Sequence, residues 1–143
     1  MKRRTLAEWI ALYNRKTGDE FVPDKRYKLF YFPDKGFCEI HVDTTVQMVV
    51  VYQLCGDIHF WRYVVEFLCQ ALGYHVCATY CIRPIRPYLR LLGVIIENVE
   101  YTPLGERYYC REKYTGQTLI ASPSSIMSLG GIREYYITWE VVS

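Results

Sequence analysis

The sequence lacks a strong excess of charge of either sign, and it has no long hydrophobic run. Its 143 residues carry 17 Lys and Arg against 15 Asp and Glu, so nothing favours broad attraction to nucleic acid or to a membrane surface. No apolar stretch reaches the roughly 18 residues that span a bilayer. No apolar segment follows the initial Met-Lys-Arg-Arg, as a secretory signal would require. We therefore expect a cytoplasmic protein without a nucleic-acid or membrane partner.

Paired cysteines are also missing. The six cysteines stand at positions 38, 55, 69, 77, 81 and 110, with no Cys-x-x-Cys and no Cys/His knuckle spacing. Most have apolar neighbours, among which a free cysteine behaves as a small hydrophobe. We predict free cysteines and no metal site, as in proteins of the reducing cytosol.

What the sequence does contain is a globular pattern, with 51% hydrophobic residues in a chain that fits one domain. Thr5 and Glu8 form a capping box before a short amphipathic stretch, which predicts an N-terminal helix. Residues 28–33 and 37–43 are typical of a hairpin, and residues 46–53, apolar on both faces, are typical of a central strand.

A crossover unit follows the central strand. Residues 57–72 have an apolar face opposite a polar stripe, which predicts a helix that packs on a sheet. Residues 75–81 predict the next strand. Because the connection is helical, this strand should lie parallel to residues 46–53 and next to them.

The last third of the chain is less regular. Pro84 or Pro87 suits the first position of a short helix. A second hairpin is predicted over residues 94–102 and 106–114. Of the remaining tail, residues 135–142 have the composition of a strand.

This order of elements, together with Arg-Pro-Tyr-Leu-Arg-Leu-Leu-Gly-Val at residues 86–94, resembles the GNAT superfamily of N-acetyltransferases. Within it, the chain looks closest to divergent proteins carried by bacteriophages. The resemblance covers about residues 5–114 and leaves 115–143 as a C-terminal extension of one domain, residues 1–143. It implies an α+β fold, the GNAT-like acyl-CoA N-acyltransferase fold, with a central mixed sheet and flanking helices.

The resemblance also implies an acetyl-CoA site. In the family, a turn written Gln/Arg-x-x-Gly-x-Gly/Ala holds the pyrophosphate, and here Gln53, Gly56 and Ile58 stand at those positions. The branched side chain of Ile58 crowds the phosphates, and Asp57 repels them. The turn is therefore degraded relative to the family. The residues that the resemblance assigns to acetyl-CoA are Val51, Gln53, Cys55, Gly56, Asp57, Ile58, Arg83 and Arg86.

The family's general acid is a tyrosine four residues before the Gly of the Leu-Gly pair. Leu89 occupies that position here, and Tyr88 is the neighbouring tyrosine. One residue corresponds to about 100° of rotation on a helix. Either the helix shifts its register or the acid is absent.

A general base could come from Glu39, His41 or Asp43, which share one face of a strand. The alternative is that this face of an antiparallel sheet is its solvated outer face. The arginines near residue 86 likewise suit either the CoA phosphates or a solvated surface.

Two functions follow from these observations. The first is an acetyl-CoA-dependent N-acetyltransferase that modifies an amine on a small molecule or a protein. The second is a catalytically inactive GNAT-fold protein of a phage or prophage, associated with the virion and acting through protein partners or self-association. Whether the chain is an enzyme stays open at this point.

Overall fold

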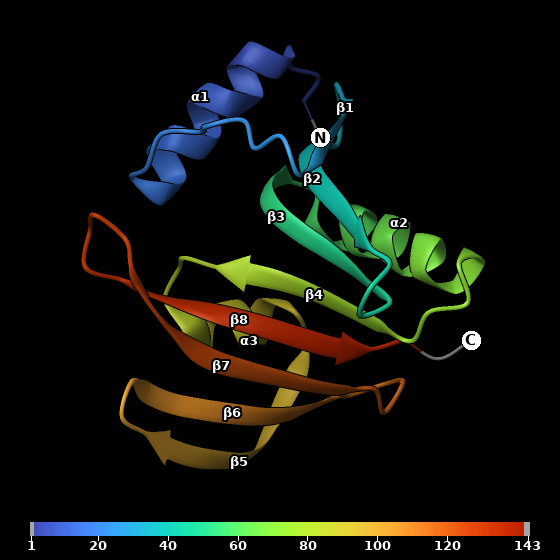
Figure 1. Ribbon diagram of the computed structural model, residues 1–143. Coiled ribbons are helices and arrows are strands. Elements are labelled where there is room, and N and C mark those ends of the chain that lie inside the picture. The colour runs from blue at the N-terminus through green and yellow to red at the C-terminus, as the bar shows by residue number, and fades with distance from the viewer. Residues whose placement is uncertain (1, 142–143) are drawn as a thin grey trace.

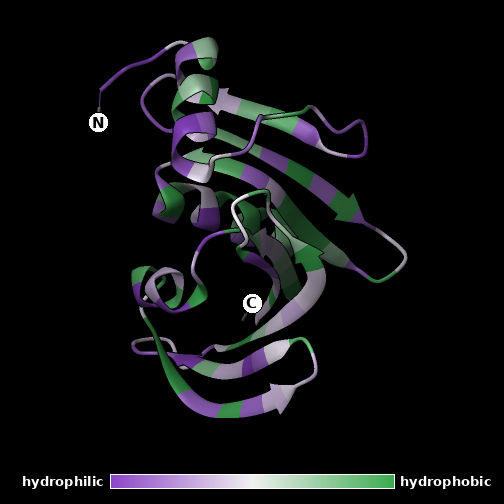
Figure 2. Ribbon diagram, turned by 90° about the vertical axis from the view of Figure 1, so that its left-hand side faces the viewer, coloured by the Kyte–Doolittle hydropathy of each residue, from purple (hydrophilic) through white to green (hydrophobic). Residues whose placement is uncertain are grey.

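The computed structural model describes residues 2–141, which form a mixed sheet with helices packed on it (Figure 1). Along the chain the elements are α1 (Leu6–Thr17), β1 (Lys28–Phe32), β2 (Gly36–Asp43), β3 (Met48–Gly56), α2 (Ile58–Ala71), β4 (Val76–Cys81), α3 (Ile85–Leu91), β5 (Val94–Thr102), β6 (Gly105–Glu112), β7 (Thr118–Met127) and β8 (Arg133–Glu140). Within the described residues the sheet has eight strands in the order β1-β2-β3-β4-β8-β7-β6-β5. The predicted α+β fold with a mixed sheet is confirmed. Figure 2 shows that the sheet is strongly curved and that hydrophobic residues gather on its central strands.

Helix α1 begins where the capping box predicts. The Oγ1 of Thr5 accepts a hydrogen bond from the N–H of Glu8 at 3.2 Å, and Oε1 of Glu8 accepts one from the N–H of Thr5 at 2.9 Å. Gly18, with a φ of +74°, ends the helix in the left-handed conformation. The helix covers a small core of its own, made of Trp9, Tyr13, Phe21, Phe37 and Cys55.

Strands β3 and β4 form the parallel pair that the helical crossover predicted. They pair from Met48 with Val76 to Val51 with Thr79, and α2 connects them. The other neighbouring strands are antiparallel. Because β3 continues to Gly56 after its pairing with β4 has stopped, the two strands diverge at their C-terminal ends, as predicted.

A β-bulge in β3 accounts for this divergence. The pairing of β2 with β3 shifts between Cys38 and Ile40, so that Tyr52 and Gln53 of β3 together lie opposite Glu39 of β2. A bulge of this kind bends its strand and leaves backbone groups out of the ladder. The end of β3 therefore turns away from β4.

The C-terminal part of the chain corrects the expectation of an extension over residues 115–143. Its described portion holds β7 and β8, which lie inside the sheet between β4 and β6. Leu119, Ala121, Ile137 and Trp139 are buried in the main core. Strand β7 is difficult to predict from the sequence because its inward side chains are mostly small. They include Pro123, and proline is unusual within a strand.

All six cysteines are buried and free, as their apolar neighbours predict. Among residues 2–141, no three His, Cys, Asp or Glu side chains are grouped so that they could hold a metal ion. No helix in this part of the chain is long and apolar enough to cross a membrane.

Candidate functional site

The diverging ends of β3 and β4 leave a cleft of about 220 Å³ between them, here called the β3–β4 cleft. Gly56 and Ile58 line it from the turn that leads into α2, and Arg83 and Tyr88 line it from the segment that follows β4. Residues of α1 complete the wall. The cleft therefore lies where the bulge has separated the two parallel strands.

Gly56 is required by the contact between β2 and β3. Its φ is +123°, and a Cβ at this position would lie 2.2 Å from the carbonyl oxygen of Lys35 and 2.9 Å from the Cα of Gly36. Gly36 is its partner in the sheet and has an equally close backbone neighbour. The glycine in the turn thus has a structural reason that is independent of any phosphate.

Asp57 caps α2 and occupies part of the helix N-terminus. Its carboxylate accepts a hydrogen bond from the N–H of Phe60 at 3.1 Å and lies 3.5 Å from Nζ of Lys35. These two contacts, that of Phe60 first, lower the pKa of Asp57, so the group is negatively charged at neutral pH. The N–H groups of Ile58 and His59 have no acceptor within the helix, because they belong to its first turn.

Helix α3 presents Tyr88, and not Leu89, to the β3–β4 cleft. Leu89 is 1% exposed and anchors α3 in the main core, while Tyr88 is partly exposed and lines the cleft. Burial raises the pKa of the Tyr88 hydroxyl well above its ordinary value. The tyrosine that is one residue away from the family position is therefore the one placed in the cleft, with its proton retained.

The two arginines assigned to acetyl-CoA lie in different places. Arg83 lines the β3–β4 cleft. Arg86 lies 3.2 Å from Glu106 in an ion pair, and its guanidinium sits 5.0 Å from the ring centroid of Tyr108. Arg83 is thus the arginine positioned to meet a ligand in the cleft.

The side chains of Val51, Gln53 and Cys55 point away from the cleft. The Nε2 of Gln53 donates to the carbonyl oxygen of Val22 and to Oε1 of Glu39, both at 2.7 Å. Val51 packs in the main core, and Cys55 packs in the core beneath α1. From this part of β3, the residues that line the cleft are instead Tyr52, Leu54 and Gly56.

Glu39 and His41 do not line the cleft that contains Tyr88. Glu39 is 2% exposed, and its Oε2 accepts a hydrogen bond from the N–H of Asp24 at 3.2 Å. The expectation that it lies on a solvated outer face is wrong, because the loop after α1 covers it. The ring of His41 packs against Tyr27, with 5.7 Å between the ring centroids.

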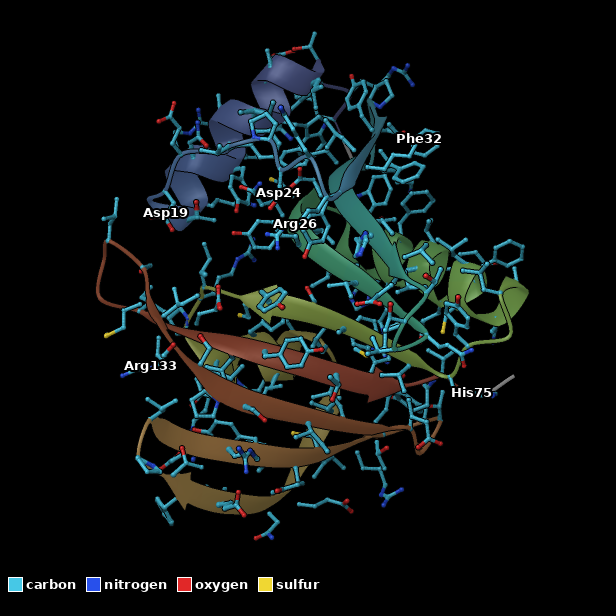
Figure 3. All side chains as sticks on the ribbon, viewed as in Figure 1. Asp19, Asp24, Arg26, Phe32, His75 and Arg133 are labelled. Carbon is cyan, nitrogen blue, oxygen red and sulfur yellow. The ribbon has the colours of Figure 1, made fainter. Side chains whose placement is uncertain are left out.

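A second cleft, of about 510 Å³, lies between the loop after α1 and the tip of the β7–β8 hairpin. Figure 3 labels Asp19 and Asp24 on that loop and Arg133 at the start of β8. We call it the acidic cleft, because its lining includes four carboxylates and one basic residue, namely Asp19, Glu20, Asp24, Glu134 and Lys25. Tyr13, Tyr52 and Ile82 line both clefts, so the two clefts adjoin each other.

Glu134 is the residue of this site that the sequence reasoning missed. It is a buried carboxylate on β8, one residue before a run of aromatic and β-branched residues. Because Arg133 precedes it and Glu140 ends the same strand, the sequence of β8 does not single out Glu134 as a buried carboxylate. Its burial depends on the place of β8 between β4 and β7, which no local pattern records.

No protein-family model and no curated protein matches this chain. Three solved structures have similar folds. Nourseothricin acetyltransferase is 8% identical, with a TM-score of 0.47 over 87% of this chain and 71% of its own. Ard1 from Thermoplasma volcanium is 9% identical, with a TM-score of 0.47 over 99% and 97%. A ribosomal-protein alanine N-acetyltransferase from Escherichia coli is 11% identical, with a TM-score of 0.44 over 99% and 93%. Identities this low say nothing about chemistry.

Proposed function

We propose that this protein binds acetyl-CoA in the β3–β4 cleft and transfers the acetyl group to an amine. The observation that carries the proposal is the divergence of the parallel pair at the β-bulge. It opens a cleft beside backbone groups that have left the ladder, and the same cleft is lined by the start of α2 and by Tyr88. Acetyl-CoA is consumed in such a reaction and is therefore a substrate.

The chain's residues suggest how the acetyl donor would be held. The pyrophosphate would lie at the start of α2, where the N–H groups of Ile58 and His59 and the helix dipole favour an anion. Arg83 would add a positive charge from the segment after β4. Backbone N–H groups at the bulge would polarise the thioester carbonyl.

In the proposed reaction, the nitrogen of the amine attacks the thioester carbon and the carbon–sulfur bond breaks. Tyr88 donates its proton to the leaving thiolate. Its place in the β3–β4 cleft suits this role. Most of the rate enhancement would come from holding the two substrates together.

Two features of the turn weaken the binding of the acetyl donor. The branched side chain of Ile58 projects into the β3–β4 cleft. The negative charge of Asp57 stands at the helix end that the pyrophosphate would approach. We expect acetyl-CoA to bind less tightly than it would to a turn with a small residue at position 58.

Titration calorimetry with acetyl-CoA tests this proposal. Arg83→Gln should lower the affinity several-fold, because it removes a cation from the cleft. Arg86→Gln is the matched control, since its guanidinium is held by Glu106 elsewhere, and it should leave the affinity unchanged. Absence of binding to the wild-type protein would overturn the proposal.

A second candidate function is a catalytically inactive protein with a structural or interaction role in a phage or prophage, including a place in the virion. The turn favours it, since Gly56 serves the β2–β3 contact and Asp57 is bound to the helix end and to Lys35. Its partner would be another protein or a second copy of this chain. Under this alternative the purified protein is folded but binds no acetyl-CoA.

A further inference from the structure

Glu134 is a buried carboxylate without a cationic partner. It is 5% exposed, and its Oε1 accepts a hydrogen bond from Oγ of Ser124 at 3.0 Å. Among residues 2–141, no lysine, arginine or histidine forms an ion pair with it. Burial raises the pKa of Glu134 above its ordinary value of 4.5. A carboxylate in this state accepts a proton more readily than an exposed one.

Glu134 also lies near the place where the two clefts meet. It lines the acidic cleft, which shares Tyr13, Tyr52 and Ile82 with the β3–β4 cleft. Its proximity to Tyr52 is seen in the pKa of that tyrosine, which is raised by burial first and by the charge of Glu134 next. The acidic cleft, with Glu134 in its wall, therefore borders the β3–β4 cleft at Tyr52.

We propose that the amine substrate enters through the acidic cleft and that Glu134 is the catalytic base that removes a proton from its ammonium group. This inference rests on the proposed acetyl transfer in the β3–β4 cleft. Asp19 and Glu20 at the mouth attract a cation, and the exposed side chains of Ile126 and Leu129 offer contact to its apolar part. The substrate class is thus a primary amine that is protonated in solution and carries an apolar group.

The other candidate bases do not have this placement. Both oxygens of Glu39 accept hydrogen bonds from the protein, and Glu39 lines neither cleft. His41 lines neither cleft and packs against Tyr27. Of these three residues, Glu134 alone lines one of the two adjoining clefts.

The step balances as follows. The ammonium gives one proton to the Glu134 carboxylate and becomes a neutral amine, whose lone pair attacks the thioester carbon. The carbon–nitrogen bond forms and the carbon–sulfur bond breaks, and the thiolate takes the proton of Tyr88. The second amine proton leaves to solvent, and Glu134 releases its proton while Tyr88 regains one. The products are the amide, CoA with a free thiol, and one proton.

Two amines of different basicity test the role of Glu134. Butylamine is protonated at neutral pH and needs a base, whereas trifluoroethylamine is mostly neutral and does not. Transfer from acetyl-CoA to each amine is measured with the wild type, Glu134→Gln and Glu134→Asp, after thermal melting has shown that the variants are folded. Glu134→Gln should lower kcat/KM for butylamine by about 100-fold or more and that for trifluoroethylamine by less than about threefold. Glu134→Asp should restore part of the loss.

The possible outcomes distinguish a failure of the role of Glu134 from a failure of the proposed acetyl transfer. Equal losses for the two amines, or no loss for butylamine, would overturn the role of Glu134 while leaving the acetyltransferase intact. Binding of acetyl-CoA without transfer to either amine would also overturn that role. Failure of the wild type to bind acetyl-CoA would instead overturn the proposed function, and the inference would fall with it.

Discussion

The β2–β3 pair and the β7–β8 pair each bury a glutamate, but the two regions satisfy it differently. In β2–β3, Glu39 accepts hydrogen bonds from the N–H of Asp24 and from the side-chain amide of Gln53. At the end of the same pair, Gly36 and Gly56 lie in direct backbone contact. Both oxygens of Glu39 are thus occupied, and Glu39 lines neither the β3–β4 cleft nor the acidic cleft.

The β7–β8 pair is open by comparison. Its pairing is interrupted between Pro123 and Met127, and at its tip Leu129 is 93% exposed. Glu134 has the hydroxyl of Ser124 as its partner and otherwise faces a cleft. The same residue type is thus a structural anchor in one pair and a chemically available group in the other. The difference between the two glutamates comes from the number of hydrogen-bond donors that the surrounding backbone and side chains supply.

The largest effect should come from breaking the backbone contact in β2–β3. Gly56→Ala places a Cβ 2.2 Å from a carbonyl oxygen at a φ of +123°, so both crowding and backbone strain oppose folding. We expect a loss of about 3–5 kcal/mol in the free energy of unfolding, measured by urea denaturation.

The matched control is Gly116→Ala. Its φ of +72° is also positive, although it lies in the milder left-handed region, and a Cβ there meets nothing within 4 Å. It should cost about 1 kcal/mol. Equal costs at the two positions would mean that close contact does not lock β2 to β3.

The next largest effect is a difference in the free energy of unfolding between alanine variants of the two glutamates. Glu39→Ala leaves the N–H of Asp24 and one donor of Gln53 without their acceptor in a buried site, which should cost about 2–4 kcal/mol. Glu134→Ala leaves only the hydroxyl of Ser124 without its acceptor, and should cost less than about 1 kcal/mol. Similar costs for the two variants, in the same denaturation assay, would remove the distinction between anchor and available group.

The region around β2 and β3 was also easier to predict from the sequence than the β7–β8 pair. The capping box of α1, the alternation of β2 and the apolar run of β3 are local patterns, and the helical crossover dictates that β4 lies parallel to β3. By contrast, β7 alternates between small and polar residues around Pro123, so its hydrophobic signal is weak. Its place in the sheet depends on pairing with β8 and β6, which no local pattern records.

The candidate site shows the same difference between features that local sequence patterns mark and features that depend on distant segments. The turn from Gly56 to Ile58 and the nearby Tyr88 could be found because the GNAT resemblance marks their spacing. The burial of Glu39 could not be foreseen, since it depends on a loop that folds back from α1. Glu134 was out of reach for a related reason, because its cleft is shared between that loop and a distant hairpin.

A smaller effect is expected at the turn itself, on binding and not on stability. Ile58→Gly removes a branched side chain from the β3–β4 cleft and should tighten acetyl-CoA binding roughly fivefold, or about 1 kcal/mol. His59→Gly is the matched control, since it lies in the same helical turn but does not line the cleft. Glycine should destabilise both variants by about 0.5–1 kcal/mol. If calorimetry shows that Ile58→Gly weakens binding, Ile58 contacts the acetyl donor and the turn is an intact site of another design.

The smallest effect is a change in the pH dependence of stability at Glu134. Its pKa in the folded protein is raised by burial above the ordinary value of 4.5, so the folded state holds this proton more tightly than the unfolded state. The sign follows from linkage. As the pH rises from 4.5 through the folded pKa, the wild type loses stability, because the charged carboxylate is desolvated in the native state.

Glu134→Gln removes that titration and keeps the shape of the side chain. Its melting temperature should therefore exceed that of the wild type at neutral pH, and the difference should shrink below pH 4.5, where the wild-type carboxyl is protonated in both states. Glu140→Gln, at the exposed end of the same strand, reports the effect of one fewer negative charge on β8. Melting curves of the three proteins across this pH range measure the difference. If Glu134→Gln melts below the wild type at neutral pH, the charged carboxylate is stabilised by its surroundings. Glu134 would then be an anchor like Glu39, and the contrast between the two strand pairs would not hold.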